Sequence, residues 1–184
     1  MRISDDRYNR DRLRFDLALR FMRHEARTHT IRNWTGLTDD RIRKLYRAYM
    51  VDAPKRVRRH RGKSPQQASF FTRSIRLQQE AAVLASLLCM LGVIPTTMAV
   101  DGSSPIPGVT RGERLCQAFE GYRLLVPDTP ITFEHAVLLV NSLARGDELR
   151  LDGCSECGGL AIVDRLALQP VHCVYCQREV ESAC

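Results

Sequence analysis

The sequence predicts a mainly α-helical fold, a helical bundle that begins with a helix-turn-helix-like segment and ends in a small four-cysteine ribbon. Apolar residues recur at helical spacing over most of the chain, glycines and prolines interrupt that spacing, and two Cys-x-x-Cys pairs lie near the C-terminal end. We predict three domains: a basic helical segment over residues 1–63, a helical core over residues 64–146 and the four-cysteine ribbon over residues 147–184.

The first predicted helix covers residues 10–27. Leu13, Leu17 and Phe21 recur there at the spacing of one helix face, and arginines lie between them. We therefore expect an amphipathic helix with its apolar stripe toward the core.

Residues 28–49 resemble a helix-turn-helix. Gly36 can adopt the left-handed conformation that the turn requires, and Thr38 is placed to cap the second helix. The outward face of that helix offers four basic side chains as predicted DNA contacts: Arg41, Arg43, Lys44 and Arg47. Asp39 and Asp40, at its start, either accept a hydrogen bond from cytosine or interact with the positive end of the helix dipole.

The next segment, residues 51–69, is expected to be a loop because it is rich in residues that break helices. Its basic residues are a second set of predicted DNA contacts: Lys55, Arg56, Arg58, Arg59, Arg61 and Lys63. Such contacts need only phosphates, so a high density of positive charge is sufficient.

Three further helices are expected to form the core. The first runs over residues 69–91, with Ile75 among the residues that face inward. The second starts at Thr110, and the third is capped by Thr132 and ends before Gly146.

The net charge of +7 is unevenly distributed. Residues 1–63 contain 19 Lys and Arg against 8 Asp and Glu, whereas residues 64–184 contain 9 against 13. Positive charge is therefore confined to the first third, to which a polyanion would be attracted. A basic surface can also be merely solvated, but this charge density favours nucleic acid as the partner.

The two cysteine pairs have the spacing of a metal site. Cys154 and Cys157 form the first pair, and Cys173 and Cys176 form the second. Two intervening residues let both sulfurs of a pair face one ion, and four cysteines make a closed tetrahedral set. We therefore predict one structural Zn²⁺ per chain in a zinc ribbon. Two disulfides, a redox dithiol and an iron–sulfur cluster are the alternatives.

The chain around these pairs adds detail to the prediction. The glycines after Cys157 suit a tight knuckle, in which backbone N–H groups point at the sulfurs. Residues 160–164 and 166–171 are rich in aliphatic side chains and predict a short hairpin between the pairs. His172 is an alternative to one cysteine as a ligand.

Three further cysteines have other expected roles. Cys89 and Cys116 lie in apolar helical stretches, where we expect packing residues, and Cys184 is expected to be an exposed free thiol. The start of the chain has no apolar region of the secretory kind, so we expect a cytoplasmic protein. The apolar stretch over residues 81–91 has the length of a core helix, and no membrane partner is expected.

No catalytic residue is predicted. His24 and His29 resemble a zincin motif, but they are five positions apart instead of four and do not share a helix face. There is also no glycine-rich phosphate loop. We therefore expect a binding protein and not an enzyme.

Several motifs occur in an order that is typical of one protein family. They are Leu45-Tyr46 in the helix-turn-helix-like segment, Gly62-Lys63-Ser64-Pro65 before Phe70-Phe71, and Cys154-Ser155-Glu156-Cys157-Gly158-Gly159 with Cys173-Val174-Tyr175-Cys176. In this order the chain resembles the FlhC family, subunits of the bacterial flagellar master transcriptional activator. The resemblance covers about residues 12–178.

This resemblance implies a function. FlhC subunits pair with FlhD in a heterohexamer of four FlhD and two FlhC subunits, which binds promoter DNA upstream of flagellar operons and recruits sigma-70 RNA polymerase. The resemblance also implies that the four paired cysteines hold one structural zinc ion. The alternatives from the residues are a zinc-ribbon RNA-binding or ribosome-associated protein and a zinc-stabilised scaffold for an acidic partner.

Overall fold

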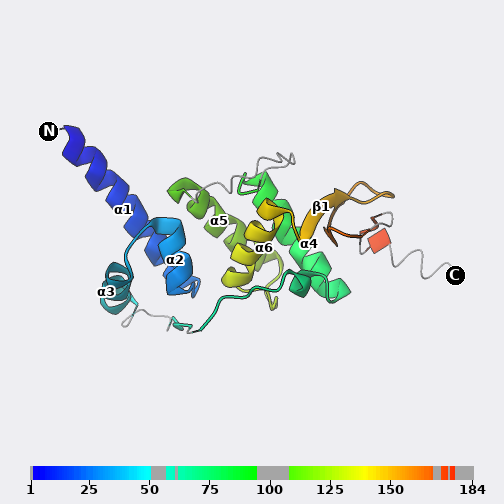
Figure 1. Ribbon diagram of the computed structural model, residues 1–184, viewed down its shortest axis with the longest axis horizontal. Helices are drawn as coiled ribbons and strands as arrows, with labels where there is room; N and C mark the ends of the chain where they lie inside the picture. The colour runs from blue at the N-terminus through cyan, green and yellow to red at the C-terminus, as the bar shows by residue number, and fades with distance from the viewer. Residues whose placement is uncertain are drawn as a thin grey trace. The chain divides into compact units, whose positions relative to one another are not determined.

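The computed structural model describes residues 2–50, 57–60, 62–94, 108–167, 171–173 and 175–176. The elements in these ranges are α1 (Arg2–Arg23), α2 (Thr28–Thr35), α3 (Asp39–Tyr49), the 3₁₀ turn η1 (Ala68–Phe71), α4 (Ile75–Met90), α5 (Val109–Leu125), α6 (Phe133–Arg145), β1 (Leu149–Gly153) and β2 (Leu160–Asp164) (Figure 1). The fold is mainly helical with a C-terminal cluster of four cysteines, as predicted. None of the described helices is both long enough and apolar enough to cross a bilayer.

The chain divides into two compact units. The first comprises Met1–Ser64 and Pro105–Gln117, and the second comprises Pro65–Ser104 and Ala118–Cys184. Helix α5 therefore contributes its N-terminal part to the first unit and its C-terminal part to the second.

In the first unit, α2 and α3 pack against the C-terminal part of α1 (Figure 1). Leu17 and Phe21 of α1 are fully buried there, and the Phe21 ring centre lies 6.0 Å from that of Trp34. The helix predicted over residues 10–27 begins earlier and ends at Arg23. Leu13 is 54 % exposed and lies outside the buried stripe, because α2 and α3 cover only the last turns of α1.

The turn between α2 and α3 has the predicted geometry. Gly36 has a φ of 71°, and the Thr38 hydroxyl accepts a hydrogen bond from the N–H of Arg41 at 3.5 Å. Leu37 and Ile42 are no more than 3 % exposed and fill the space between the helices. The helix-turn-helix-like segment is therefore present in the fold.

The long core helix begins later than predicted. Instead of a helix over residues 69–91, η1 is followed by α4 from Ile75, because Ser74 is extended and its hydroxyl caps the helix by accepting the N–H of Leu77 at 3.3 Å. Ile75, which was predicted to face inward, is 44 % exposed in this first turn.

The boundaries of the last two helices agree closely with the prediction. Helix α5 begins at Val109, one residue before Thr110. Thr132 caps α6 and forms a capping box with His135, whose Nδ1 accepts the N–H of Thr132 at 3.1 Å. Gly146, with a φ of 62°, ends α6 as predicted.

The capping box requires a neutral His135, because a protonated ring has no lone pair at Nδ1 to accept a hydrogen bond. Burial lowers the pKa of His135, and Arg73 lowers it further against an opposing effect of Glu134. The unfolded chain therefore binds the proton more tightly than the folded chain. We expect His135 to stabilise the second unit fully above the unfolded pKa of about 6.5 and this stabilisation to be lost as pH falls through the lower folded value.

The variant His135→Gln tests this pH dependence. Glutamine can accept the same hydrogen bond without titrating, so it keeps the capping box at any pH. Urea unfolding at pH 7.5 and pH 5 should show a loss of about 1 kcal/mol in the original chain that the variant lacks. An equal pH dependence in both proteins would contradict the assignment to His135.

A buried carboxylate joins α4 to the end of α5 and to the loop before α6. Glu80 is 6 % exposed, and it accepts hydrogen bonds from the Thr129 hydroxyl and from Nε of Arg76, each at 2.7 Å. The Tyr122 hydroxyl also donates to Glu80, at 3.4 Å, and burial raises the pKa of Tyr122 to about 12. Three segments of the second unit therefore meet at one acidic side chain.

Candidate metal centre and basic surface

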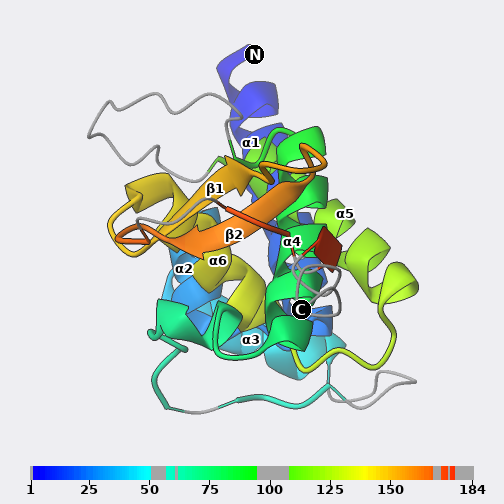
Figure 2. The same ribbon diagram turned by 90° about the vertical axis from the view of Figure 1, so that its right-hand side faces the viewer.

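The C-terminal ribbon is built on the hairpin of β1 and β2, which lies against α4 and α6 (Figure 2). Leu151 pairs with Ile162 at its centre, and Leu149 is only 2 % exposed. The described partner of residues 160–164 is thus β1, and residues 168–170 of the predicted partner segment 166–171 lie outside the described residues. The partner of β2 precedes the first cysteine pair, because leucines that alternate with polar residues in β1 bury one face of that strand.

This hairpin places the first cysteine pair in its connecting loop. The N–H of Cys154 donates to the carbonyl of Gly159, and the N–H of Gly158 donates back to the carbonyl of Cys154, both at 2.8 Å. Gly158 has a φ of 70°, which favours glycine. The N–H of Gly159 points at the sulfur of Cys157 at 3.4 Å, and a Cβ on Gly159 would lie 3.2 Å from that sulfur. Both glycines therefore form the predicted knuckle.

The four predicted ligands come together. The sulfurs of Cys154, Cys157, Cys173 and Cys176 all lie within 4.8 Å of one another, and those of Cys157 and Cys173 are 3.6 Å apart. Tetrahedral zinc–sulfur bonds of about 2.3 Å place neighbouring sulfurs about 3.8 Å apart. The four sulfurs, all free thiols, therefore fit a metal ion of this kind.

The second pair is tied to the first through Ser155. Its N–H and its hydroxyl donate to the carbonyl of Val171 at 2.8 and 3.1 Å. The Nδ1 of His172 lies 3.3 Å from the same hydroxyl, and His172 is not part of the four-sulfur cluster. The cluster therefore consists of cysteines alone.

Backbone hydrogen bonds favour a thiolate at Cys154. Donors from the backbone of Cys157 and of Cys173 lower the pKa of Cys154 to about 6, below its ordinary value of 9.0. Hydrogen bonds with Cys173 and with Cys157 raise the pKa of Cys176 instead. Cys154, which is only 4 % exposed, is therefore the sulfur that loses its proton readily. A divalent cation bound to the four sulfurs would displace the remaining thiol protons.

The other cysteines lie outside this cluster. Cys116 is buried, as expected for a packing residue. Cys89 is half-buried in α4, and burial raises the pKa of its thiol. Cys184 lies outside the described residues.

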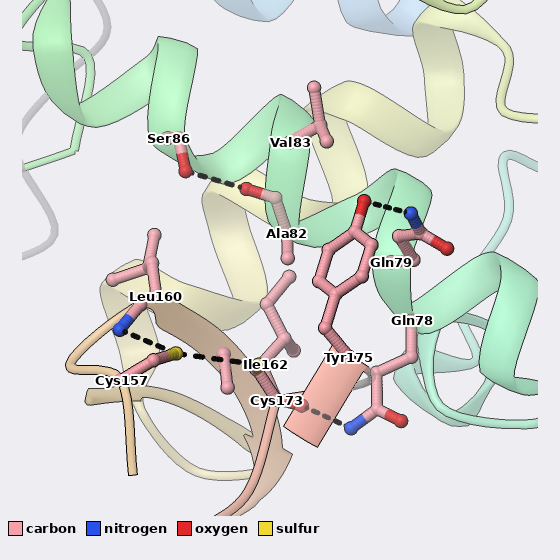
Figure 3. Close-up of a pocket in the computed structure, with 12 residues that line it drawn as sticks. Gln78, Gln79, Ala82, Val83, Ser86, Cys157, Leu160, Ile162, Cys173 and Tyr175 are labelled. Atoms are coloured by element: carbon pink, nitrogen blue, oxygen red, sulfur yellow. Dashed lines mark hydrogen bonds between the residues drawn. The ribbon is translucent and has the colours of Figure 1, made fainter. Parts of the chain in front are cut away.

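A small groove separates the cysteine cluster from α4 (Figure 3). It has a volume of about 240 Å³ and no charged side chain in its lining, which includes Cys157, Cys173 and Val83. Gln78 donates to the carbonyl of Ile162 at 2.9 Å across the groove, and Gln79 bonds the hydroxyl of Tyr175. Neutral contacts therefore hold the ribbon on α4.

Ten residues were predicted to contact DNA, and the described ones are all exposed: Arg41, Arg43, Lys44, Arg47, Arg58, Arg59 and Lys63. The other three, Lys55, Arg56 and Arg61, lie outside the described residues. Arg43 donates to Asp40 at 3.0 Å, and Arg32 lies 3.6 Å from Asp39, so acidic residues neutralise part of the charge at the start of α3. Lys44 and Arg47 have no acidic partner among the described side chains.

Residues 57–60 of the basic loop lie against the helices of the first unit. The Tyr46 hydroxyl donates to the carbonyl of Val57 at 2.8 Å. The guanidinium of Arg59 lies 5.5 Å from the centre of the Tyr46 ring and donates to the Thr28 hydroxyl at 3.4 Å. These contacts place the described part of the loop beside α3.

Sequence reasoning missed Glu25, which also contacts this loop. Its carboxylate accepts the N–H of Arg58 at 3.1 Å and lies 2.9 Å from Nε2 of His60. An acidic residue at the end of a basic helix was the only signal, and it gives no hint of partners more than thirty positions away.

Comparisons of this chain with protein-family models and with curated proteins gave no match. The resemblance to the FlhC family therefore stays a prediction.

Proposed function

We propose that this chain is a DNA-binding subunit of a hetero-oligomeric transcriptional activator and that its four clustered cysteines hold one structural Zn²⁺. The observation that supports DNA binding is that two basic segments adjoin in the first unit. Tyr46 of α3 contacts both Val57 and Arg59, so the outward face of α3 and the described part of the arginine-rich loop are neighbours.

The proposed mechanism is binding and recruitment, with no bond made or broken. Phosphate contacts from these side chains supply affinity and fix the orientation of the duplex. An assembly with two copies would read two half-sites and bend the DNA between them.

The metal has a structural role in this proposal. Four protein ligands leave no position for water or substrate, so the ion supplies a cross-link and no catalysis. The closed set consists of Cys154, Cys157, Cys173 and Cys176. A cross-link is needed here because a two-stranded hairpin is marginally stable alone.

The resemblance to the FlhC family extends the proposal to partners. They are FlhD, in a heterohexamer of four FlhD and two copies of this chain, promoter DNA of flagellar operons, and sigma-70 RNA polymerase. Co-purification with FlhD and a footprint on a flagellar promoter test this directly. Failure of both would overturn the proposed partners. Structured RNA that competes as well as operator DNA would favour an RNA-binding protein instead.

Two double variants measure the contribution of each basic segment. Lys44→Ala with Arg47→Ala removes charge from α3, and Arg58→Ala with Arg59→Ala removes it from the loop. We expect each pair to weaken duplex binding and to reduce the slope of log affinity against log salt by up to about 1.8, since each phosphate contact contributes about 0.9. Fluorescence anisotropy from 50 to 200 mM salt gives the slopes.

A matched control removes two exposed arginines from the second unit, Arg123→Ala with Arg145→Ala. The overall charge change is the same, so this pair should leave the salt slope nearly unchanged. Equal losses in all three double variants would indicate general attraction to a basic protein and not a defined surface.

A further inference from the structure

Glu25 has an unusual backbone conformation. Its φ of 60° makes it the single non-glycine residue with a positive φ among the described residues. It lies two residues after Arg23, the last residue of α1. Its N–H donates to the carbonyl of Met22 at 2.8 Å, and the N–H of Ala26 donates to that of Phe21 at 3.0 Å. Glycine is the residue that such a helix end favours, because a side chain is strained there. A glutamate at this position therefore points to a role for its side chain.

That side chain holds the basic loop. One carboxylate oxygen accepts the N–H of Arg58 at 3.1 Å, and the other lies 2.9 Å from Nε2 of His60. Burial tends to raise the pKa of Glu25, but the hydrogen bonds from His60 and Arg58 outweigh it and lower the pKa. The residue is therefore a carboxylate at neutral pH, bound to the backbone N–H of Arg58 and to the ring of His60, on the two sides of Arg59.

A carboxylate at this place would oppose the attraction of a polyanion if charge alone mattered. Removing it should then strengthen DNA binding. The contacts of Glu25 should instead strengthen DNA binding, because they order the segment that carries Arg58 and Arg59. An ordered segment loses less conformational freedom when its side chains bind phosphates.

We infer that Glu25 is a positioning residue for nucleic-acid binding, which fixes residues 57–60 beside α3 so that Arg58 and Arg59 meet the phosphate backbone of duplex DNA in a prearranged geometry. This inference rests on the proposed DNA-binding function. The strained backbone of Glu25, just after α1, would then serve DNA binding by placing its carboxylate against residues 57–60.

The variant Glu25→Gly separates positioning from stability. Glycine relieves the backbone strain, which offsets the lost hydrogen bonds, so the thermal unfolding midpoint should change little. Positioning predicts that the variant binds duplex DNA roughly three- to tenfold more weakly, although its net charge is more positive. It also predicts a smaller salt slope and faster hydrogen exchange at the amide of Arg58 in the free protein.

Asp16→Asn is the matched control, because it also removes one carboxylate from the first unit, on α1 and outside the predicted DNA contacts. Asp16 pairs with Arg12 at 3.8 Å and, among the described side chains, has no hydrogen bond or ion pair with residues 57–60. This variant should therefore bind DNA at least as tightly as the original chain and keep the exchange rate of Arg58. If the Glu25→Gly variant binds duplex DNA as tightly as the original chain, or more tightly, the inference about Glu25 is overturned and the proposed DNA-binding function is not. An original chain that binds no duplex DNA even at low salt would overturn the proposed function together with it.

Discussion

Replacing Cys157 by serine is expected to lower the metal content from about one zinc per chain to nearly none and to unfold the ribbon. Structural zinc contributes an apparent binding free energy of about 10–16 kcal/mol at neutral pH, far more than a short hairpin gains from its own contacts. In this ribbon few apolar side chains are buried; Leu149, Ile162 and Val163 are the main ones in the two strands. Most of the folding free energy of the ribbon must then come from the metal.

The contacts that seat the ribbon on α4 should be lost with the metal. Hydrogen exchange should become fast at β2 and at Tyr175, while the amides of α1 to α3 stay protected, because those helices belong to the other unit. Elemental analysis gives the metal content, and Cys89→Ser, which changes a cysteine outside the cluster, is the control. A Cys157→Ser protein with full metal content, or a metal-free protein with a protected ribbon, would contradict the structural-zinc proposal.

Acid should release the same metal. Thiols must lose their protons to bind an ion, so protons compete with the metal as pH falls. Backbone donors already lower the pKa of Cys154 to about 6, so that sulfur should be among the last to be protonated.

We expect the substitution Glu80→Ala to reduce the free energy of unfolding of the second unit by about 3 kcal/mol. The change leaves the buried Thr129 hydroxyl without its acceptor and leaves the Tyr122 hydroxyl with Thr129 alone, and an unsatisfied buried group costs about 1–3 kcal/mol. For a chain of this length, such a loss lowers the melting temperature by about 6–12 °C. Differential scanning calorimetry and urea unfolding measure it.

Two further variants separate the parts of this effect. Glu80→Gln keeps an acceptor of the same shape and should cost less than Glu80→Ala. Tyr122→Phe removes the weak hydrogen bond to Glu80, at 3.4 Å, and the bond between the Tyr122 and Thr129 hydroxyls, and should cost about 1–2 kcal/mol. If Glu80→Ala is no worse than Tyr122→Phe, the carboxylate does not join the three segments.

The pH dependence of Glu80 has a definite sign. Burial tends to raise its pKa, but hydrogen bonds from Thr129 and Arg76 outweigh this and lower it. The folded-state pKa therefore lies below the unfolded value of about 4.3. The stabilisation by Glu80 is fully present above that unfolded value and is lost as pH falls through the folded one.

Features that depend on near neighbours in the sequence were predicted correctly. The turn at Gly36, the caps at Thr38 and Thr132, and the cysteine spacing each need only a few consecutive residues to identify them. The predicted start of α4 was wrong because helical spacing continues upstream of Ser74, although the hydroxyl of that residue caps the N-terminus of the helix.

Features that depend on distant partners were missed. Strand β1 contains charged residues and forms a strand because it pairs with β2 and buries Leu149. Two of the three donors to the buried Glu80, Tyr122 and Thr129, lie 42 and 49 positions later in the sequence. In the same way, Glu25 meets Arg58 across 33 positions, and local composition carries no information about such a contact.

The connection between β1 and β2 also limits how the chain can vary in length. A residue added between Gly153 and Leu160 would either move Cys157 away from the second pair or shift β2 by one position. Such a shift would turn Ile162 from the interior to solvent, because successive strand residues face opposite sides. Surface hairpin loops ordinarily tolerate insertions, but in chains that share this ribbon we expect this connection to keep its length.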